Sequence, residues 1–254
     1  MRIDILTLFP DSVVDVLSDS ILGRAQERGF IQIDAHQIRE YTASKQCQVD
    51  DYPYGGGRGA IMQADPLYRC WEAVCDQAGG PVYTVYMSPC GKTFKQEDAI
   101  RLSKLDNLIL VCGHYEGIDQ RFIDECVDEE ISLGDFVLTG GEIAAMAVTD
   151  AVCRMVPGVL ADPECFEDES HYSGMLEYPQ YSRPAVWHGR EVPPILLSGD
   201  HAKVAQWRRK EALRRTRDRR PDMYNKLDLS SKQDKKLLAQ MEQEDLESQE
   251  NKNV

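Results

Sequence analysis

The chain has 254 residues, of which 42% are hydrophobic and 28% are charged. This length fits one large domain, or a medium domain with a smaller partner, and the composition excludes a mostly disordered or fibrous chain. The formal net charge of −14 argues against binding of nucleic acid by the surface as a whole. Between Arg208 and Arg220, however, eight basic residues stand against two acidic ones, so this segment alone could hold a polyanion.

No apolar run approaches the roughly 18 residues of a membrane-spanning helix. The N-terminus lacks the small-residue cleavage site of a secretory signal. We therefore expect a cytoplasmic protein without a membrane partner. The eight cysteines include no Cys-x-x-Cys pair, so free and mostly buried thiols are expected. The five histidines lack metal-ligand spacing, and no zinc site is expected.

The first two-thirds of the chain alternates strand and helix patterns. Residues 2–9 alternate like a strand, and Asp11 or Ser12 is expected to cap a helix whose apolar positions recur from Val13 to Ala25. Further strands are expected at 81–87, 107–112 and 130–133, and further helices at 95–105, 119–127 and 142–156. This alternation predicts an α/β layer with a mainly parallel sheet.

The pattern changes after Pro157-Gly158. Acidic residues crowd between Asp162 and Glu169, and four prolines follow before residue 195, which is typical of a linker and an irregular entry into a second unit. We divide the chain into an α/β domain (1–160), an acidic linker (161–175), a small helical domain (176–246) and a polar tail (247–254). The clearest helix of the second domain is 202–217.

Three of the expected strands run into glycine-containing loops, at 88–91, 113–119 and 133–141. In open α/β sheets, ligands bind outside the carboxyl ends of the strands, and glycine lets backbone groups approach them closely. The loops therefore predict a ligand pocket. No segment carries G-x-G-x-x-G after a strand or G-x-x-x-x-G-K-[ST], so neither a dinucleotide-dependent oxidoreductase nor a nucleotide triphosphatase is supported.

The glycine-rich run at 55–59 could wrap a phosphate through backbone amides or form a flexible surface loop. Together with the three loops, it resembles the motifs of the bacterial tRNA (guanine-N1)-methyltransferases, knotted enzymes of the SPOUT class. The similar strings, in chain order over residues 1 to about 228, are Leu8-Phe9-Pro10, Asp50-Asp51-x-Pro53-Tyr54-Gly55-Gly56-Gly57, Tyr86-x-Ser88-Pro89-x-Gly91, Gly113-x-Tyr115-Glu116-Gly117-Ile118-Asp119, Gly134-Asp135-x-Val137-Leu138-x-Gly140-Gly141-Glu142, Pro157-Gly158-Val159-Leu160 and Tyr181-x-Arg183-Pro184.

The resemblance implies a deep trefoil knot in the sheet domain, an exception to the rule that folds avoid knots. It implies transfer of a methyl group from S-adenosylmethionine to N1 of the guanine immediately 3′ of the tRNA anticodon, by a homodimer with active sites at the subunit interface. It also implies magnesium in catalysis, for which the sequence shows no site, and no DNA partner. The residues that it implies for the methyl donor are Tyr86, Ser88, Pro89, Gly113, Tyr115, Gly117, Leu133, Gly134, Asp135, Phe136, Val137, Leu138, Gly140 and Gly141.

Guanine N1 carries a proton, so its methylation needs a base, together with a positive group near the neighbouring carbonyl oxygen. The resemblance gives the role of the positive group to Arg154 and the role of the base to an aspartate directly before a serine. Here Glu169 precedes Ser170, and Asp168 stands one step earlier. We expect Glu169 to be the base because it keeps the register with Ser170, with Asp168 as the alternative. Glu116 either bonds the exocyclic amine of guanine, helps to place the donor, or caps the following helix.

The basic helix at 202–217 either pairs with acidic residues of the chain or holds RNA, and the resemblance favours RNA. The residues expected to contact tRNA are Asp50, Tyr54, Gly55, Gly56, Gly57, Arg58, Gly59, Arg183, Arg208, Arg209, Arg214 and Arg215. Two alternatives stay open: a knotted methyltransferase that acts on another RNA position, and a non-catalytic RNA-binding protein of the same fold.

Overall fold

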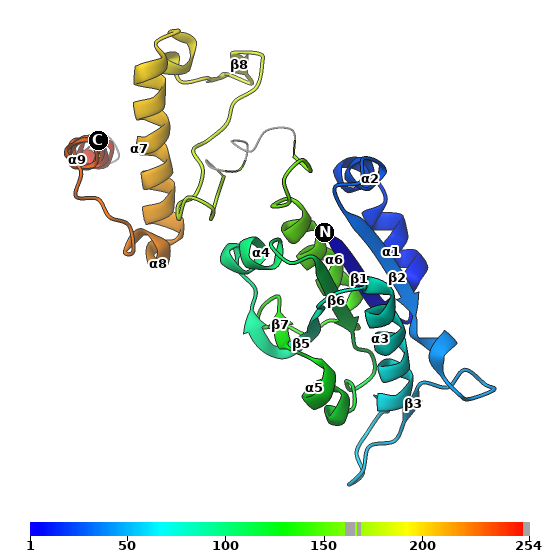
Figure 1. The fold of residues 1–254 in the computed structure, drawn as a ribbon. Coiled ribbons are helices and arrows are strands. Elements are labelled where there is room, and N and C mark those ends of the chain that lie inside the picture. The colour runs from blue at the N-terminus through cyan, green and yellow to red at the C-terminus, as the bar shows by residue number, and fades with distance from the viewer. Residues whose placement is uncertain (161–165, 167–168, 251–254) are drawn as a thin grey trace. The chain divides into compact units, whose positions relative to one another are not determined.

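The computed structural model describes residues 1–160, 166 and 169–250. The chain forms two compact units, Met1–Pro163 and Glu164–Val254; Figure 1 labels their elements. Within the described residues, no helix is both long and apolar enough to cross a membrane. Several residues of the linker expected at 161–175 lie outside the described part of the chain, and the domain boundaries stay predictions.

The first unit is built on a five-stranded sheet in which every neighbouring pair is parallel. Across the sheet, the strands are β2 (Gln32–Gln37), β1 (Arg2–Thr7), β6 (Asn107–Cys112), β5 (Tyr83–Thr93) and β7 (Glu129–Ser132). The predicted α/β class with a mainly parallel sheet is confirmed. Strand β2 was not predicted, because its mixed sequence QIDAHQ carries no clear apolar alternation.

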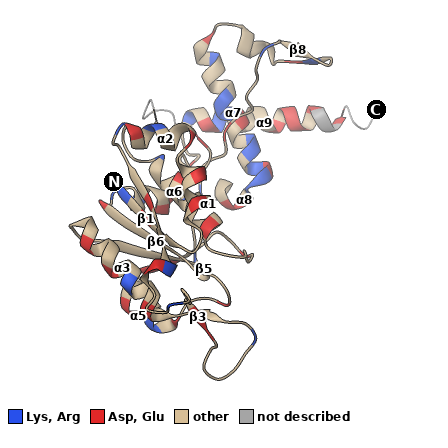
Figure 2. Cartoon of the chain, turned by 90° about the vertical axis from the view of Figure 1, so that its right-hand side faces the viewer, with Lys and Arg blue, Asp and Glu red and all other residues tan. Residues whose placement is uncertain are grey.

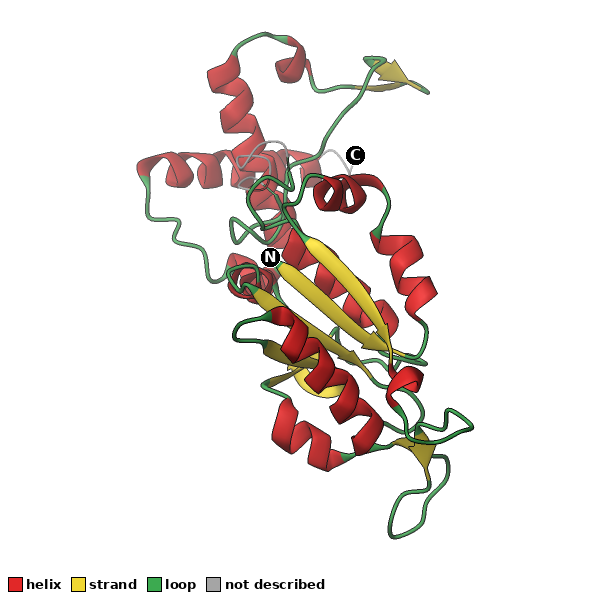
Figure 3. Ribbon diagram, turned by 45° about the vertical axis from the view of Figure 1, so that its right-hand side comes forward, coloured by secondary structure: helices red, strands yellow, loops and turns green. Residues whose placement is uncertain are grey.

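Helices cover both faces of this sheet (Figure 3). One face packs against α1 (Pro10–Leu17), α2 (Ser20–Glu27), α4 (Gln96–Leu102) and α6 (Glu142–Cys153), and the other against η1 (Ile38–Tyr41), α3 (Ala64–Ala78) and α5 (Gln120–Cys126). Along β6, Leu108 and Leu110 point into the first core, and Ile109 and Val111 into the second. Burial on both faces explains the continuous apolar run of this strand.

Two helices replace the single one expected between Asp11 and Ala25. Helix α1 begins at Pro10, with Phe9 at its N-cap in place of the expected Asp11 or Ser12. Proline fits the first turn of a helix because the N–H that it lacks would have no partner there. The second helix begins after Asp19, whose carboxylate accepts a hydrogen bond from the Ser20 N–H. The local cap therefore outweighs the continuous apolar periodicity.

Helix α3 was missed, although its signal is present in the sequence. Leu67, Cys70 and Val74 recur at helical spacing and are buried, and Gly79 ends the helix in the left-handed conformation. Strand β5 is longer than expected. It continues past Met87 to Thr93 with a register shift against β7, so Ser88–Gly91 forms an irregular part of the strand and not a loop after it.

The second unit contains a small hairpin, β8 (Val186–Trp187) and β9 (Arg190–Glu191), the short helices η3 (Pro194–Leu197) and α8 (Pro221–Tyr224), and two long helices, α7 (His201–Arg219) and α9 (Lys232–Glu250). Leu237 and Met241 of α9 pack against Leu213 of α7 in the core of this unit. Helix α9 continues to Glu250, into the segment expected as a tail at 247–254, because neither glycine nor proline interrupts it.

The seven cysteines in the described part of the chain are free thiols, and Cys165 lies outside that part. Cys70, Cys112, Cys126 and Cys153 are buried. Burial raises the pKa of the Cys126 thiol to about 11 and that of Cys153 to about 12. These thiols stay protonated at neutral pH and serve as small apolar side chains.

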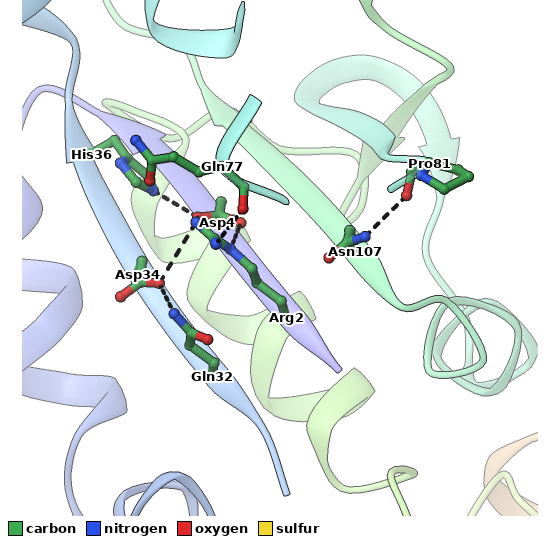
Figure 4. Close-up of polar contacts among 8 residues, drawn as sticks. All are labelled: Arg2, Asp4, Gln32, Asp34, His36, Gln77, Pro81 and Asn107. Carbon is green, nitrogen blue, oxygen red and sulfur yellow. Dashed lines mark hydrogen bonds and ion pairs between the residues drawn. The ribbon is translucent and has the colours of Figure 1, made fainter. Parts of the chain in front are cut away.

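A buried carboxylate lies on β1, next to the edge strand β2 (Figure 4). Asp4 is 1% exposed and accepts hydrogen bonds from Arg2 Nε at 2.8 Å and from the His36 ring at 2.7 Å. Its burial raises the pKa of the Asp4 carboxyl, but the hydrogen bonds and charges of His36 and Arg2 outweigh burial and leave the pKa below its usual value. The ion pair therefore contributes stability while the carboxylate is charged.

We expect Asp4→Asn to destabilise the protein at pH 7 by about 3 kcal/mol, because it leaves Arg2 without its buried counter-charge. The pKa of Asp4 is lower in the folded than in the unfolded state, so its contribution is complete above the unfolded pKa of about 3.9 and is lost as the pH falls through the folded pKa. Urea unfolding should show the gap between variant and parent narrowing below about pH 4. Asp34→Asn is the control, since Asp34 lies 3.9 Å from Arg2 with a side chain 41% exposed, and it should cost less than about 1 kcal/mol.

Candidate active site

Strands β6, β5 and β7 are neighbours in the sheet, so their carboxyl ends meet at one edge. The segments that follow them line a cavity of about 430 Å³, a size typical of small-molecule sites. Twelve of the fourteen predicted donor residues line this cavity: Tyr86, Ser88, Pro89, Gly113, Tyr115, Gly117, Leu133, Phe136, Val137, Leu138, Gly140 and Gly141. The structure therefore brings together three segments that are separate in the sequence.

Gly134 and Asp135 are not among the lining residues. The Gly134 carbonyl accepts hydrogen bonds from the Phe136 N–H and the Ser132 hydroxyl, at 2.9 and 3.0 Å. Gly134 also adopts a φ of 153°, which favours glycine. Gly134 therefore shapes the turn that leads to Phe136, and contact of Gly134 and Asp135 with the donor stays a prediction.

The cavity wall is made where two chain segments cross at close range. The Gly141 N–H donates to the Gly113 carbonyl at 3.0 Å, and a Cβ on Gly141 would lie 2.7 Å from the Cα of Cys112. A Cβ on Gly113 would lie 2.8 Å from the hydroxyl oxygen of Tyr86. Burial raises the pKa of Tyr86 to about 12, so it stands in the wall as a neutral phenol. Close packing therefore requires glycine at positions 113 and 141.

A buried polar cluster that was not predicted from the sequence supports this wall. Glu142 is 7% exposed and begins α6. Its carboxylate accepts hydrogen bonds from the Thr7 hydroxyl at 2.6 Å and from His114 Nε2 at 2.8 Å. His114 lines the cavity, and its ring centroid lies 5.0 Å from that of Phe9. The cluster ties the ends of β1 and β6 to the start of α6.

Glu116 lies at the exposed rim of the same cavity, next to the glycine-rich segment. That segment lies between the short strands β3 (Asp50–Asp51) and β4 (Ile61–Met62). The Glu116 N–H donates to the Ala60 carbonyl at 3.0 Å, and a Cβ on Gly59 would lie 2.6 Å from the Glu116 side chain. Helix α5 is capped by Asp119, whose carboxylate accepts from the Arg121 N–H. This leaves the Glu116 carboxylate available at the rim.

The remaining predicted site residues lie elsewhere. Arg154 follows the last residue of α6, and this 12-residue helix places it roughly 18 Å from the end that borders the cavity. Glu169 belongs to the second unit, and Asp168 lies outside the described residues. Of the residues expected to contact tRNA, those at 50–59 belong to the first unit, where Gly59 lies against Glu116, and the five arginines from Arg183 to Arg215 belong to the second unit.

The chain matches the family described as tRNA (Guanine-1)-methyltransferase TrmD over residues 1–226. It is 51% identical over 227 residues to the tRNA (guanine-N(1)-)-methyltransferase of Ruminiclostridium cellulolyticum, covering 89% of this chain and 97% of that protein. It is 54% identical over 238 residues to the protein of the same name from Clostridium perfringens, covering 94% and 99%. A third relative of that name, from Herpetosiphon aurantiacus, is 52% identical over 240 residues, covering 94% of each.

Proposed function

Because the chain belongs to the tRNA (Guanine-1)-methyltransferase TrmD family, we propose that it transfers a methyl group from S-adenosylmethionine to N1 of the guanine immediately 3′ of a tRNA anticodon, in the cytoplasm. The observation that carries this proposal is the cavity at the carboxyl ends of β5, β6 and β7, with twelve predicted donor residues in its wall. The family also implies the deep trefoil knot. The names of the relatives do not favour action on another RNA position or a non-catalytic role.

The cavity has the features that a bound nucleoside-like donor requires. Its wall contains glycine-containing segments that pack closely, since a Cβ at Gly113 would collide with Tyr86 and a Cβ at Gly141 with Cys112. Leu138 and Phe136 add apolar surface for a flat ring, and Glu116 places a carboxylate at the rim. S-adenosylmethionine supplies a methyl group on a positively charged sulfur, which a nearby carboxylate stabilises.

The reaction forms a bond between N1 and the methyl carbon and breaks the bond between that carbon and sulfur. The N1 proton passes to a carboxylate, for which we propose Glu169. Arg154 stabilises the negative charge that develops on the carbonyl oxygen as this proton leaves. Glu116 accepts a hydrogen bond from the exocyclic amine, which helps to distinguish guanine from adenine.

Arg154 acts in this reaction only if a second copy of the chain supplies it. The length of α6 places it roughly 18 Å from the end of the helix that borders the cavity of its own subunit. Three large apolar side chains are exposed along α1 and the start of α6: Phe9 (51%), Val14 (46%) and Ile143 (57%). Apolar surface of this kind is typical of subunit interfaces, and two-fold pairing is the commonest arrangement. We therefore propose a homodimer with active sites at its interface.

The described residues contain no group of three or more histidine, cysteine, aspartate or glutamate side chains placed to hold a metal ion. We therefore assign no residues to the magnesium that the family implies, and we derive no step through it.

The function is tested by nucleoside analysis of unmodified tRNA after incubation with purified protein and S-adenosylmethionine. We expect 1-methylguanosine, formed only at the position after the anticodon. A tRNA with adenosine at that position is the matched control and should stay unmethylated. Methylation of another base, or of another guanine, would contradict the proposal.

We expect Glu142→Ala to weaken the binding of the product S-adenosylhomocysteine about tenfold, because it removes the acceptor that holds Thr7 and His114 behind the wall. Glu142→Gln keeps an acceptor oxygen and should stay within about threefold of the parent. Isothermal titration calorimetry measures both. Equal losses of affinity in the two variants would show that donor binding depends on the negative charge of Glu142 and not on the geometry of its hydrogen bonds.

A further inference from the structure

Helix α7 carries most of the basic cluster of the chain, and α9 packs against it (Figure 2). The family match ends at residue 226, so α9 lies beyond it. Four basic residues of α7 form ion pairs with carboxylates of α9, and these pairs divide the basic surface of α7 into two faces.

One face of α7 is neutralised by α9. Lys210 and Arg214 both pair with Glu244, and Arg217 donates to Asp245 at 2.8 Å. Positions 210, 214 and 217 are four and three residues apart, so they share one side of the helix. Arg209 pairs in addition with the largely buried Asp234, at 3.1 Å.

A second face carries Arg208, Arg215 and Arg219. They are seven and four residues apart, which aligns them on one side of the helix over roughly 16 Å. The guanidinium of Arg208 lies 4.8 Å from the ring centre of Tyr178, and Arg215 donates to the Glu177 carbonyl at 3.2 Å. Arg219 is exposed, and within the described residues it makes no ion pair.

Residues 176–181, which include the Glu177 and Tyr178 contacts of Arg215 and Arg208, run beside α7. The Leu176 N–H donates to the Thr216 hydroxyl at 2.9 Å, and the ring of Tyr181 lies 6.4 Å from that of Trp207. Tyr181 is 49% exposed. Arg208 is stacked on Tyr178 and has no carboxylate partner among the residues that the structure describes, so its donors are oriented but not neutralised.

We propose that Arg208, Arg215 and Arg219 form the strip of α7 that binds tRNA phosphates, and that α9 withholds Lys210, Arg214 and Arg217 from RNA. This inference rests on the proposed function. An arginine already paired with a carboxylate must break that pair to bind a phosphate, and it gains little by the exchange. An arginine with no acidic partner displaces counterions from RNA at no such cost. The strip keeps Arg208 and Arg215 from the sequence-based set, adds Arg219, and leaves out Arg209 and Arg214.

The test is the salt dependence of tRNA binding, measured by fluorescence anisotropy on the full-length protein. Arg208→Gln and Arg219→Gln should each weaken binding several-fold and lower the slope of log affinity against log salt by about one. Lys210→Gln and Arg217→Gln are the matched controls on the same helix and should leave the slope unchanged. The proposal is overturned if the controls lower the slope as much as the strip variants do, or if the strip variants leave it unchanged.

A gain-of-binding variant gives a second measurement. Glu244→Gln combined with Asp245→Asn removes the α9 partners of Lys210, Arg214 and Arg217. Arg214 and Arg217 then keep only Glu211 and Asp218, their neighbours on α7, so we expect tighter tRNA binding and a steeper salt slope. Unchanged or weaker binding, with an unchanged circular dichroism spectrum, would contradict the role of α9.

Methylation of tRNA by the parent protein is assayed in parallel. If the parent methylates tRNA but the strip variants bind normally, this inference fails and the proposed function stands; if the parent does not bind tRNA, both fail.

Discussion

Replacing Arg154 by alanine should slow methyl transfer by about 10²–10³-fold while leaving the affinity for S-adenosylmethionine nearly unchanged. Arg154 lies beyond the far end of α6, roughly 18 Å from the end that borders the cavity, so we expect no contact between it and a donor bound in the cavity of the same chain. A side chain that stabilises only the charge of the transition state lowers kcat and not ground-state binding. Single-turnover kinetics and calorimetry with S-adenosylhomocysteine measure the two effects separately. Parallel loss of donor affinity would instead assign Arg154 to folding or donor binding.

Subunit mixing decides whether Arg154 acts across the interface. Arg154→Ala keeps an intact cavity, and Glu116→Ala keeps an intact Arg154. If each site combines one subunit's cavity with the other's arginine, an equal mixture of the two variants should regain about a quarter of the parental sites. Two copies of Arg154→Ala alone should show no such recovery. An Arg154 that acts within its own subunit would leave the mixture as slow as its components.

The local features of the site could be predicted from the sequence because their causes are local. The apolar run of β6 predicted a strand, and the glycines of the following loops predicted a close approach of backbone segments. Gly113 and Gly141 both occupy positions where a Cβ does not fit. The meeting of the three loops followed from the parallel alternation of strands and helices. The irregular extension of β5 could not be predicted, because it depends on its register against β7.

Long-range contacts explain the rest of what the sequence analysis missed. Thr7 and Glu142 are 135 residues apart, and neither carries a local pattern that indicates their hydrogen bond. Arg214 and Arg208 are the same residue type on the same helix, yet only Arg214 contacts the carboxylate of Glu244, 30 residues further along the chain. The distance of Arg154 from the cavity follows from the length and direction of α6 in the assembled sheet, and a motif does not contain that information.

The base is expected to be Glu169 and not Asp168. Both are carboxylates in one acidic run, so the argument rests on position. The Ser170 hydroxyl accepts a hydrogen bond from the Glu177 N–H at 3.0 Å, and the Glu169 N–H donates to the Phe166 carbonyl at 3.1 Å. Moving residue 168 into the position of Glu169 would shift Ser170 by one residue and break its bond to Glu177. The fixed register therefore favours Glu169.

A pair of isosteric substitutions tests this assignment, since each removes a carboxylate's basicity while keeping its shape. Under single turnover with saturating tRNA and S-adenosylmethionine, Glu169→Gln should slow methyl transfer by at least about 10²-fold, and Asp168→Asn by less than about 10-fold. Because the base is needed only once tRNA is bound, the affinity of both variants for S-adenosylhomocysteine should equal that of the parent. The reverse order of rates would assign the proton to Asp168. Parental rates in both variants would mean that neither carboxylate removes it, because base catalysis lost at this step cannot leave the rate unchanged when chemistry alone is measured.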